Sequence, residues 1–323
     1  MIHSWPWAGD LLQLVDVRSS EQQLAQYLAV RAGVRRALDD WIPGARFDAY
    51  CLVLAKLGLF VEVDCLFKPI AEAVHIAGAE IVPTTRAFGF PFRVGDEAPS
   101  GSVVHVVVSS RADWAAEAHA SSWYSVVIGS RCIRKPLVEH LRLGSAFGYP
   151  ECCVRFFLQH NDWPRMNTVA DSAAASARFL WETNCFPRHT PWMTHFHLPC
   201  SFSCPRTRDY STAVLAEVRA VDAGYAARIE QFMRLPYLVV NEVLCYALVG
   251  GRASGKGRAT YEHAIYVGGQ ARNDLYRECL ALGDELEVAD GSVFVMRRGR
   301  CVQTLEARCD SGRIDIPVLL RFE

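Results

Sequence analysis

The pattern of apolar and polar positions divides the chain into three parts. Over residues 1–133, stretches with helical spacing alternate with short apolar runs typical of buried strands. Residues 134–235 carry helical spacing almost throughout, and after Pro236 the pattern changes to short runs separated by turn residues. The sequence therefore predicts a mixed α+β protein with an α/β domain at 1–133, a helical domain at 134–235 and an antiparallel β-rich domain at 236–323.

The first part begins with helical patterns. Apolar residues recur near helical spacing over 20–41, with Pro43 and Gly44 as a stop signal. A second helix is expected over 47–57, followed by a strand at 59–63. Next comes a predicted strand, helix and strand, at residues 103–108, 113–120 and 124–128. Because a helix between two strands is typical of a βαβ crossover, we expect those two strands to pair in parallel.

The rest of the chain is predicted to be first helical and then extended. The longest helix is expected over 207–232 and stops before Pro236. Strands are expected at 237–249, 259–267, 284–289, 292–297 and 314–322. Asp290-Gly291 and Arg298-Gly299 supply tight hairpin turns on either side of the fourth strand.

Charge and hydropathy narrow the choice of partners. The 323 residues have a formal net charge of -1, so no global field favours nucleic acid or an anionic membrane. The chain shows neither a secretion signal nor an apolar run of roughly 18 to 20 residues. We therefore expect a soluble, cytoplasmic protein with no nucleic-acid or membrane partner.

The twelve cysteines are the main candidates for chemistry. In a chain of this length without a signal peptide, free thiols and metal ligands are expected rather than disulfides. Eight cysteines stand singly and are interpreted as small buried apolar residues. The other four form two clusters, Gly148-Tyr149-Pro150-Glu151-Cys152-Cys153 and His197-Leu198-Pro199-Cys200-Ser201-Phe202-Ser203-Cys204-Pro205.

Prolines predict where the four clustered cysteines lie. Pro150 suits the first position of a helix, which places Cys152 and Cys153 in the first turn, where the helix dipole favours thiolate. Pro205 is expected to open the long helix that follows the second cluster. Thiolates at such positions are suited to metal binding. The four cysteines are therefore predicted to share one metal or cluster.

The type of metal is left open between two cofactors. Cys200 and Cys204 have the spacing of a zinc ligand pair, but neighbours such as Cys152 and Cys153 point about 100° apart on a helix. A [4Fe-4S] cluster offers separate irons to separate thiolates, so we favour an iron–sulfur cluster and keep zinc as the alternative.

Other ligands and other roles are also open. His197, His195 or His189 could replace one cysteine, which would favour zinc. The vicinal pair could instead form a disulfide, act as a redox pair or be merely structural. A three-cysteine motif of the type Cys-x-x-x-Cys-x-x-Cys is excluded, because Thr207 occupies the third position.

Two motifs carry a resemblance to a known family. Gly-Tyr-Pro-x-Cys-Cys-Val-x-Phe-Phe begins at Gly148, and His-x-Pro-Cys-Ser-x-x-Cys begins at His197. Over about residues 135–320 the chain resembles an uncharacterised prokaryotic family with a domain of unknown function. The resemblance implies that a unit is formed by Cys152, Cys153, His197, Cys200 and Cys204. It implies no reaction.

Two functions follow from these predictions. If three cysteines bind a [4Fe-4S] cluster, the open fourth iron could hold a small-molecule substrate, and the protein would be a biosynthetic enzyme. If all four bind, the cluster is closed and suits electron transfer or a structural role. The alternative is a zinc-stabilised module without catalysis, which binds a peptide or protein at a sheet edge.

Overall fold

The chain folds into two compact units with mixed secondary structure. Unit 1 comprises Met1–Glu151 with Ala216–Asp222, and unit 2 comprises Cys152–Leu215 with Ala223–Glu323. The computed structural model describes residues 25–43, 54, 60–69, 85–88, 103–121, 125–128, 131–134, 140–160, 168–241, 244–253, 257–267, 275–306, 309–310, 313–314 and 317–323. Both units contain helices and antiparallel sheets, which confirms the predicted α+β class. The three predicted domain boundaries stay a prediction.

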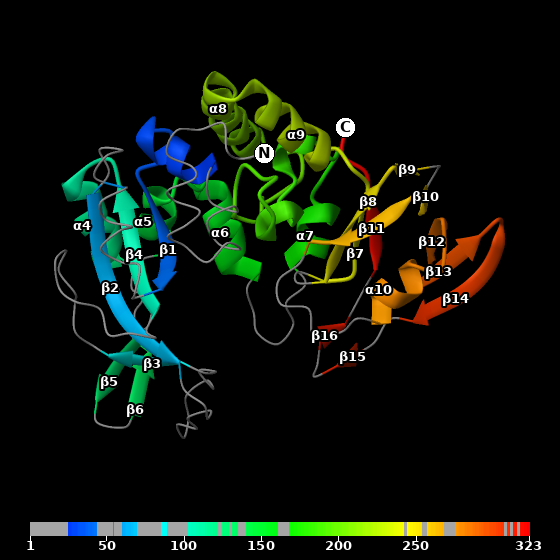
Figure 1. Ribbon diagram of the computed structural model, residues 1–323, viewed down its shortest axis with the longest axis horizontal. Helices are drawn as coiled ribbons and strands as arrows, with labels where there is room; N and C mark the ends of the chain where they lie inside the picture. Colours follow the sequence, from blue (N-terminus) through cyan, green and yellow to red (C-terminus); the bar gives the residue numbers. More distant parts are fainter. Residues whose placement is uncertain are drawn as a thin grey trace. The chain divides into compact units, whose positions relative to one another are not determined.

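Unit 1 is built on a four-stranded antiparallel sheet (Figure 1). Its strands are β1 (Ala37–Pro43), β2 (Phe60–Pro69), β3 (Thr85–Phe88) and β4 (Val103–Ser109), in the spatial order β1-β4-β2-β3. The other elements are α4 (Ala112–Ser121), α5 (His140–Ala146) and the hairpin of β5 (Ser125–Ile128) with β6 (Arg131–Arg134). The core contains Ala37, Val107, Ala118, Ala146 and Phe147.

The predicted parallel pair in unit 1 is wrong, although its strand, helix and strand all exist. β4 lies between β1 and β2 and pairs with both in antiparallel fashion, so neither of its edges is free for β5. β5 pairs instead with β6, where Ile128 lies opposite Arg131. Only two residues separate β5 from β6, which suits an antiparallel hairpin. A parallel pair would need a long crossover connection.

The helix predicted over 20–41 is too long. Residues 25–31 are helical, but Ala37 already begins β1. Gly33 ends the helix with a φ of +76°, and the N–H groups of Gly33 and Val34 donate to the carbonyls of Val30 and Ala29. This is a Schellman motif, in which glycine adopts the left-handed conformation after the last turn. The helix predicted over 47–57 lies outside the described residues except for Leu54, which is helical.

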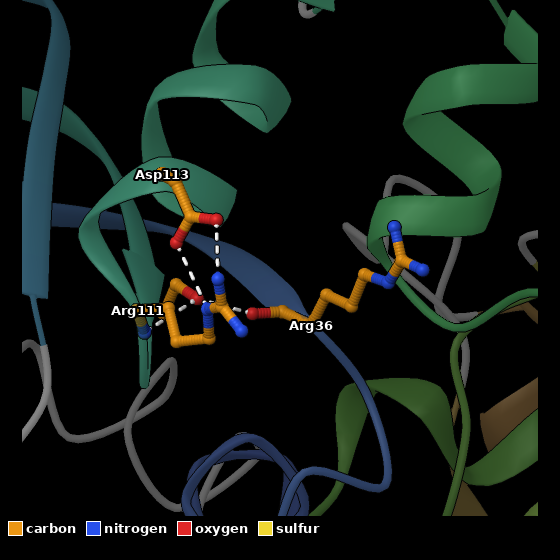
Figure 2. A network of polar contacts seen from close by, with 4 residues as sticks. Arg36, Arg111 and Asp113 are labelled. Atoms are coloured by element: carbon orange, nitrogen blue, oxygen red, sulfur yellow. Dashed lines mark hydrogen bonds and ion pairs between the residues drawn. The ribbon is translucent and has the colours of Figure 1, made fainter.

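Polar contacts connect β1, β4 and the start of α4 (Figure 2). The Ser109 hydroxyl donates to the Arg36 carbonyl and accepts the N–H of Arg111. The Arg111 guanidinium donates to both carboxylate oxygens of Asp113, at 2.9 and 2.7 Å. Because both charged side chains are exposed, this ion pair contributes little stability. The buried serine bond instead supports the β1–β4 register, in which Ala37 lies opposite Ser109.

In its described residues, unit 2 contains several helices, two larger antiparallel sheets and one two-stranded sheet (Figure 1). Its helices are α6 (Glu151–His160), α7 (Thr168–Ala174), η2 (Trp181–Thr183), η3 (Phe186–His189), α8 (Pro205–Val221), α9 (Ala223–Met233) and α10 (Leu275–Leu280). The end of α8, from Ala216 on, is assigned to unit 1. One sheet has the order β11-β8-β7-β17, from β7 (Tyr237–Val239), β8 (Cys245–Val249), β11 (His263–Tyr266) and β17 (Val318–Leu320). The other has the order β14-β13-β12-β10-β9, from β9 (Arg252–Ala253), β10 (Arg258–Thr260), β12 (Glu285–Ala289), β13 (Ser292–Arg297) and β14 (Arg300–Glu306). β15 (Cys309–Asp310) pairs with β16 (Arg313–Ile314).

The predicted elements of unit 2 are confirmed in kind and corrected in length. The helix predicted over 207–232 is two helices, because Asp222 separates α8 from α9 at a position where aspartate is favoured as an N-cap. The strand predicted over 237–249 is the β7–β8 hairpin, and that over 259–267 divides between β10 and β11 in different sheets. Both predicted hairpin turns are confirmed by their positive φ angles at Asp290, Gly291, Arg298 and Gly299.

An aromatic core connects the cysteine-bearing loop of unit 2 to the C-terminal strands. Phe202, which lies between Cys200 and Cys204, is fully buried. Its ring centroid lies 5.7 Å from that of Phe186 and 5.6 Å from that of Phe322. This core therefore gives the loop a fixed position.

Within the described ranges, no helix has both the length and the apolar character needed to cross a membrane.

Candidate metal centre

Three of the four clustered cysteines lie at the start of a helix, and Cys200 lies in the loop before α8. α6 begins at Glu151, so Cys152 and Cys153 occupy its first turn, as the preceding proline predicts. α8 begins at Pro205, and the carbonyl of Cys204 accepts the N–H of Arg208 at 3.1 Å. Cys204 is therefore the N-cap residue of α8. At both places the positive end of a helix dipole favours the thiolate form.

The four cysteine sulfurs form one compact group. The Sγ atom of Cys204 lies 3.8 Å from the Sγ atoms of both Cys152 and Cys153, which are 3.9 Å apart. With Cys200 included, all four sulfurs lie within 4.8 Å of one another. No second group of His, Cys, Asp or Glu side chains with this proximity occurs in the part of the chain that the structure describes. The arrangement can hold a metal.

The vicinal cysteines converge despite being neighbours on a helix. We expected Cys152 and Cys153 to point apart, but both sulfurs lie at 3.8 Å from that of Cys204. A thiol turns about χ1, so two neighbouring side chains can reach one point even when their Cα–Cβ bonds diverge. Cys153 is buried, whereas Cys152 is only half-buried.

Serine hydrogen bonds hold the loop that carries Cys200. The Ser172 hydroxyl donates to the carbonyl of Pro199 at 2.7 Å. The Ser176 hydroxyl oxygen accepts the N–H of Phe202, also at 2.7 Å. Both serines come from α7 or its C-terminal end, so this helix supports the loop between the two cysteines of the second cluster.

His197 is not one of the four grouped side chains. Its Nε2 atom lies 3.0 Å from Oγ1 of Thr207, and that same oxygen lies 3.3 Å from Sγ of Cys153. The histidine therefore reaches the thiols through a hydroxyl. Of the other two histidines considered as ligands, His195 lies deeper, and the side chain of His189 is outside the described part.

His195 belongs to a buried polar cluster next to His197. Its Nδ1 atom lies 3.1 Å from the Ser211 hydroxyl and 3.2 Å from that of Thr194. The two histidine rings are 4.7 Å apart. Complete burial lowers the pKa of His195 to about 4, so this imidazole is neutral at physiological pH.

Hydrogen bonding and burial distribute the charge unequally among the thiols. Contacts with Cys153 and Cys200 lower the pKa of Cys204 well below that of an ordinary thiol. Hydrogen bonds to Cys200 and Cys204, together with burial, raise the pKa of Cys153. For Cys200 the contact with Cys153 lowers the pKa, but its bond to Cys204 and burial outweigh this and raise it to about 12. One thiolate on Cys204 is therefore favoured, and a cation is needed before Cys153 and Cys200 ionise.

Sequence reasoning missed the polar residues behind the sulfurs. Thr207 entered the sequence argument only because it breaks a three-cysteine motif. On α8, however, Cys204, Thr207 and Ser211 are three and four residues apart, a spacing that puts them on one helix face. From this spacing the sequence could have predicted that Thr207 and Ser211 lie on the same helix face as Cys204.

The other cysteines whose side chains the structure describes take no part in the group. Among the described residues no disulfide occurs, and Cys185, Cys245 and Cys279 are buried, as expected for small apolar side chains. Cys301 is exposed, against that expectation. The side chains of Cys51, Cys65, Cys132 and Cys309 lie outside the description.

Comparisons with known proteins leave the site to be interpreted from its own geometry. No family model, no curated protein and no solved structure matches the chain. The resemblance to an uncharacterised prokaryotic family stays a prediction.

Proposed function

We propose that Cys152, Cys153, Cys200 and Cys204 hold one zinc ion in a tetrahedral site. The observation that carries this proposal is the separation of the sulfurs. Four thiolates around one zinc, each at about 2.3 Å from the metal, lie about 3.8 Å from one another. Three of the sulfur pairs here are separated by 3.8, 3.8 and 3.9 Å.

A zinc ion with four thiolate ligands has no open position, which favours a structural role. The ion would join the first turn of α6 to the N-cap of α8, two points 51 residues apart along the chain. Such a bond stabilises the folded unit because the unfolded chain has no preformed site. This supports a zinc-stabilised module more than an enzyme, and a peptide or protein as its partner stays a prediction.

The competing cofactor is the [4Fe-4S] cluster predicted from the vicinal cysteines. Four soft thiolates suit it as well as zinc. Thiolates that bind separate irons lie farther apart than thiolates on one ion, however, because the irons and sulfides lie between them. The observed separations therefore favour zinc.

Metal analysis of the anaerobically purified full chain tests the proposal. We expect a colourless protein with about one zinc per chain, and loss of zinc in Cys153→Ser and Cys204→Ser. Cys301→Ser is the matched control, because Cys301 is exposed and outside the group. A brown protein that contains iron and sulfide would show that the cofactor is an iron–sulfur cluster and not zinc. A protein that binds no metal, and whose fold is unaffected by both substitutions, would exclude both zinc and the iron–sulfur cluster.

A further inference from the structure

A threonine and a histidine form a buried chain that ends at one of the four sulfurs. Thr207 is fully buried and His197 nearly so, with exposed fractions of 0% and 7%. The Thr207 Oγ1 atom lies 3.3 Å from Sγ of Cys153 and 3.0 Å from Nε2 of His197. A single hydroxyl thus bridges the candidate ligand and the imidazole.

The chemistry of the three groups fixes the direction of both hydrogen bonds once Cys153 is a thiolate. A thiolate can only accept, so the Thr207 hydroxyl must donate its one proton to the sulfur. The Thr207 oxygen can then only accept a hydrogen bond from His197. The imidazole must therefore donate from Nε2, which selects the tautomer that carries its proton there.

We propose that Thr207 is a positioning residue of the metal centre, held by His197, and that it donates a hydrogen bond to the metal-bound sulfur of Cys153. The inference rests on the proposed function, in which Cys153 is a metal ligand. It assigns to His197 a supporting role in place of the ligand role considered from the sequence. Partners behind the ligands orient them and tune the metal.

The surroundings keep this chain in place. The His197 ring lies edge-on to Tyr210, with ring centroids 6.0 Å apart, and its centroid is 4.7 Å from that of His195. The sulfur of Cys153 also accepts the backbone N–H of Cys200 at 3.4 Å. Cys153 therefore has two donors besides its neighbouring thiols, and Cys204 also receives hydrogen bonds from the side chain and the backbone of Thr207.

Substitutions in the full chain test the proposal, with zinc affinity measured by chelator competition and with cobalt as a spectroscopic probe. Thr207→Val removes the hydroxyl but keeps the shape, and we expect a loss of affinity of about tenfold or more. It should also shift the sulfur-to-cobalt charge-transfer band, which a purely structural change would leave in place. Thr207→Ser should restore both properties. Thr212→Val is the matched control, since Thr212 is exposed on the same helix.

A double variant tests whether His197 affects zinc binding through Thr207. As a single substitution, His197→Phe should weaken zinc binding. Combined with Thr207→Val, it should cause no further loss of zinc affinity, because both substitutions remove the same interaction. Nitrogen NMR of the zinc-loaded unaltered chain should find the His197 proton on Nε2. Additive losses, or a proton on Nδ1 alone, would overturn the proposal.

The outcomes separate this inference from the proposed function. If the unaltered chain binds neither zinc nor cobalt at one ion per chain, the proposed function fails and this inference fails with it. If the chain binds both ions and Thr207→Val binds them with unchanged affinity and spectrum, only the inference about Thr207 is overturned. A Thr207→Val chain that does not fold leaves the tautomer of His197 as the deciding measurement.

Discussion

At the scale of single residues, the four cysteines are not equivalent. Cys153 and Cys204 are buried with exposed fractions of 1% and 3%, whereas Cys152 and Cys200 are half-buried. A thiol reacts with an alkylating reagent only where the reagent can reach its thiolate. The group therefore has an inner pair and an outer pair.

Alkylation of the metal-loaded chain should follow this difference. We expect iodoacetamide to modify Cys152 and Cys200 before Cys153 and Cys204, as followed by peptide mass spectrometry over time. Cys301 is exposed and serves as the internal reference, because its rate should not depend on metal. Equal rates at all four clustered cysteines would contradict the assignment of an inner and an outer pair.

The raised pKa values of Cys153 and Cys200 predict how metal binding depends on pH. The raised pKa values favour the protonated form of both thiols, and each must lose its proton to become a ligand. Zinc binding should therefore release protons into a weakly buffered solution, and zinc affinity should rise as the pH is raised from about 6 to about 8. An affinity that is independent of pH over this range would contradict this distribution of charge.

At the scale of elements, local signals predicted the site better than they predicted the sheets. Pro150 and Pro205 identified the starts of α6 and α8, because a missing N–H is harmless at a helix start. No local sequence signal predicted that β4 would pair with β1 and β2, because strand pairing depends on contacts between residues distant in sequence. The sequence spacing could place Thr207 on the same helix face as Cys204, but its contact with Cys153 depends on how two helix starts meet.

The loop between Cys200 and Cys204 should depend on its buried aromatic anchor. Phe202→Ala removes a ring that is 0% exposed, and we expect a loss of about 3 to 5 kcal/mol in the free energy of unfolding. Zinc affinity should fall as well, because the loop loses the contact that positions two ligands. Urea denaturation and chelator competition measure the two effects.

Phe157→Ala is the matched control for this substitution. Phe157 lies on α6 close to the first cysteine pair, but its exposed fraction is 36%. We expect a much smaller loss of stability and an unchanged zinc affinity. A Phe202→Ala chain that keeps the affinity of the unaltered protein would show that the loop needs no aromatic anchor.

At the scale of the whole molecule, the four cysteines all belong to unit 2. The four cysteines come from the start of α6 and from the loop and N-cap of α8 about fifty residues later, and their sulfurs meet as the sequence clusters predicted. The sequence pattern also predicted the α+β class and the β-rich C-terminal part. It placed the change from helical to extended pattern at Pro236, but the compact unit that contains the four cysteines includes strands after that proline.

Removal of the metal should therefore affect the two units differently. After chelation, we expect amide hydrogen exchange to accelerate at the start of α6, in the loop before α8 and in the first turn of α8. Exchange in the β1-β4-β2 ladder of unit 1 should change little, because that sheet contains none of the four cysteines. Equal acceleration in both units would contradict a role confined to unit 2.

The central claim is that one ion is shared by four cysteine sulfurs. X-ray absorption spectroscopy of the purified full chain at the zinc and iron edges tests this sharing, because each edge reports the number, type and distance of the atoms around its own metal. We expect four sulfur neighbours of zinc at about 2.3 Å and no neighbouring metal atom. A spectrum with nitrogen or oxygen in place of a sulfur, or an iron centre with a second iron nearby, would contradict it.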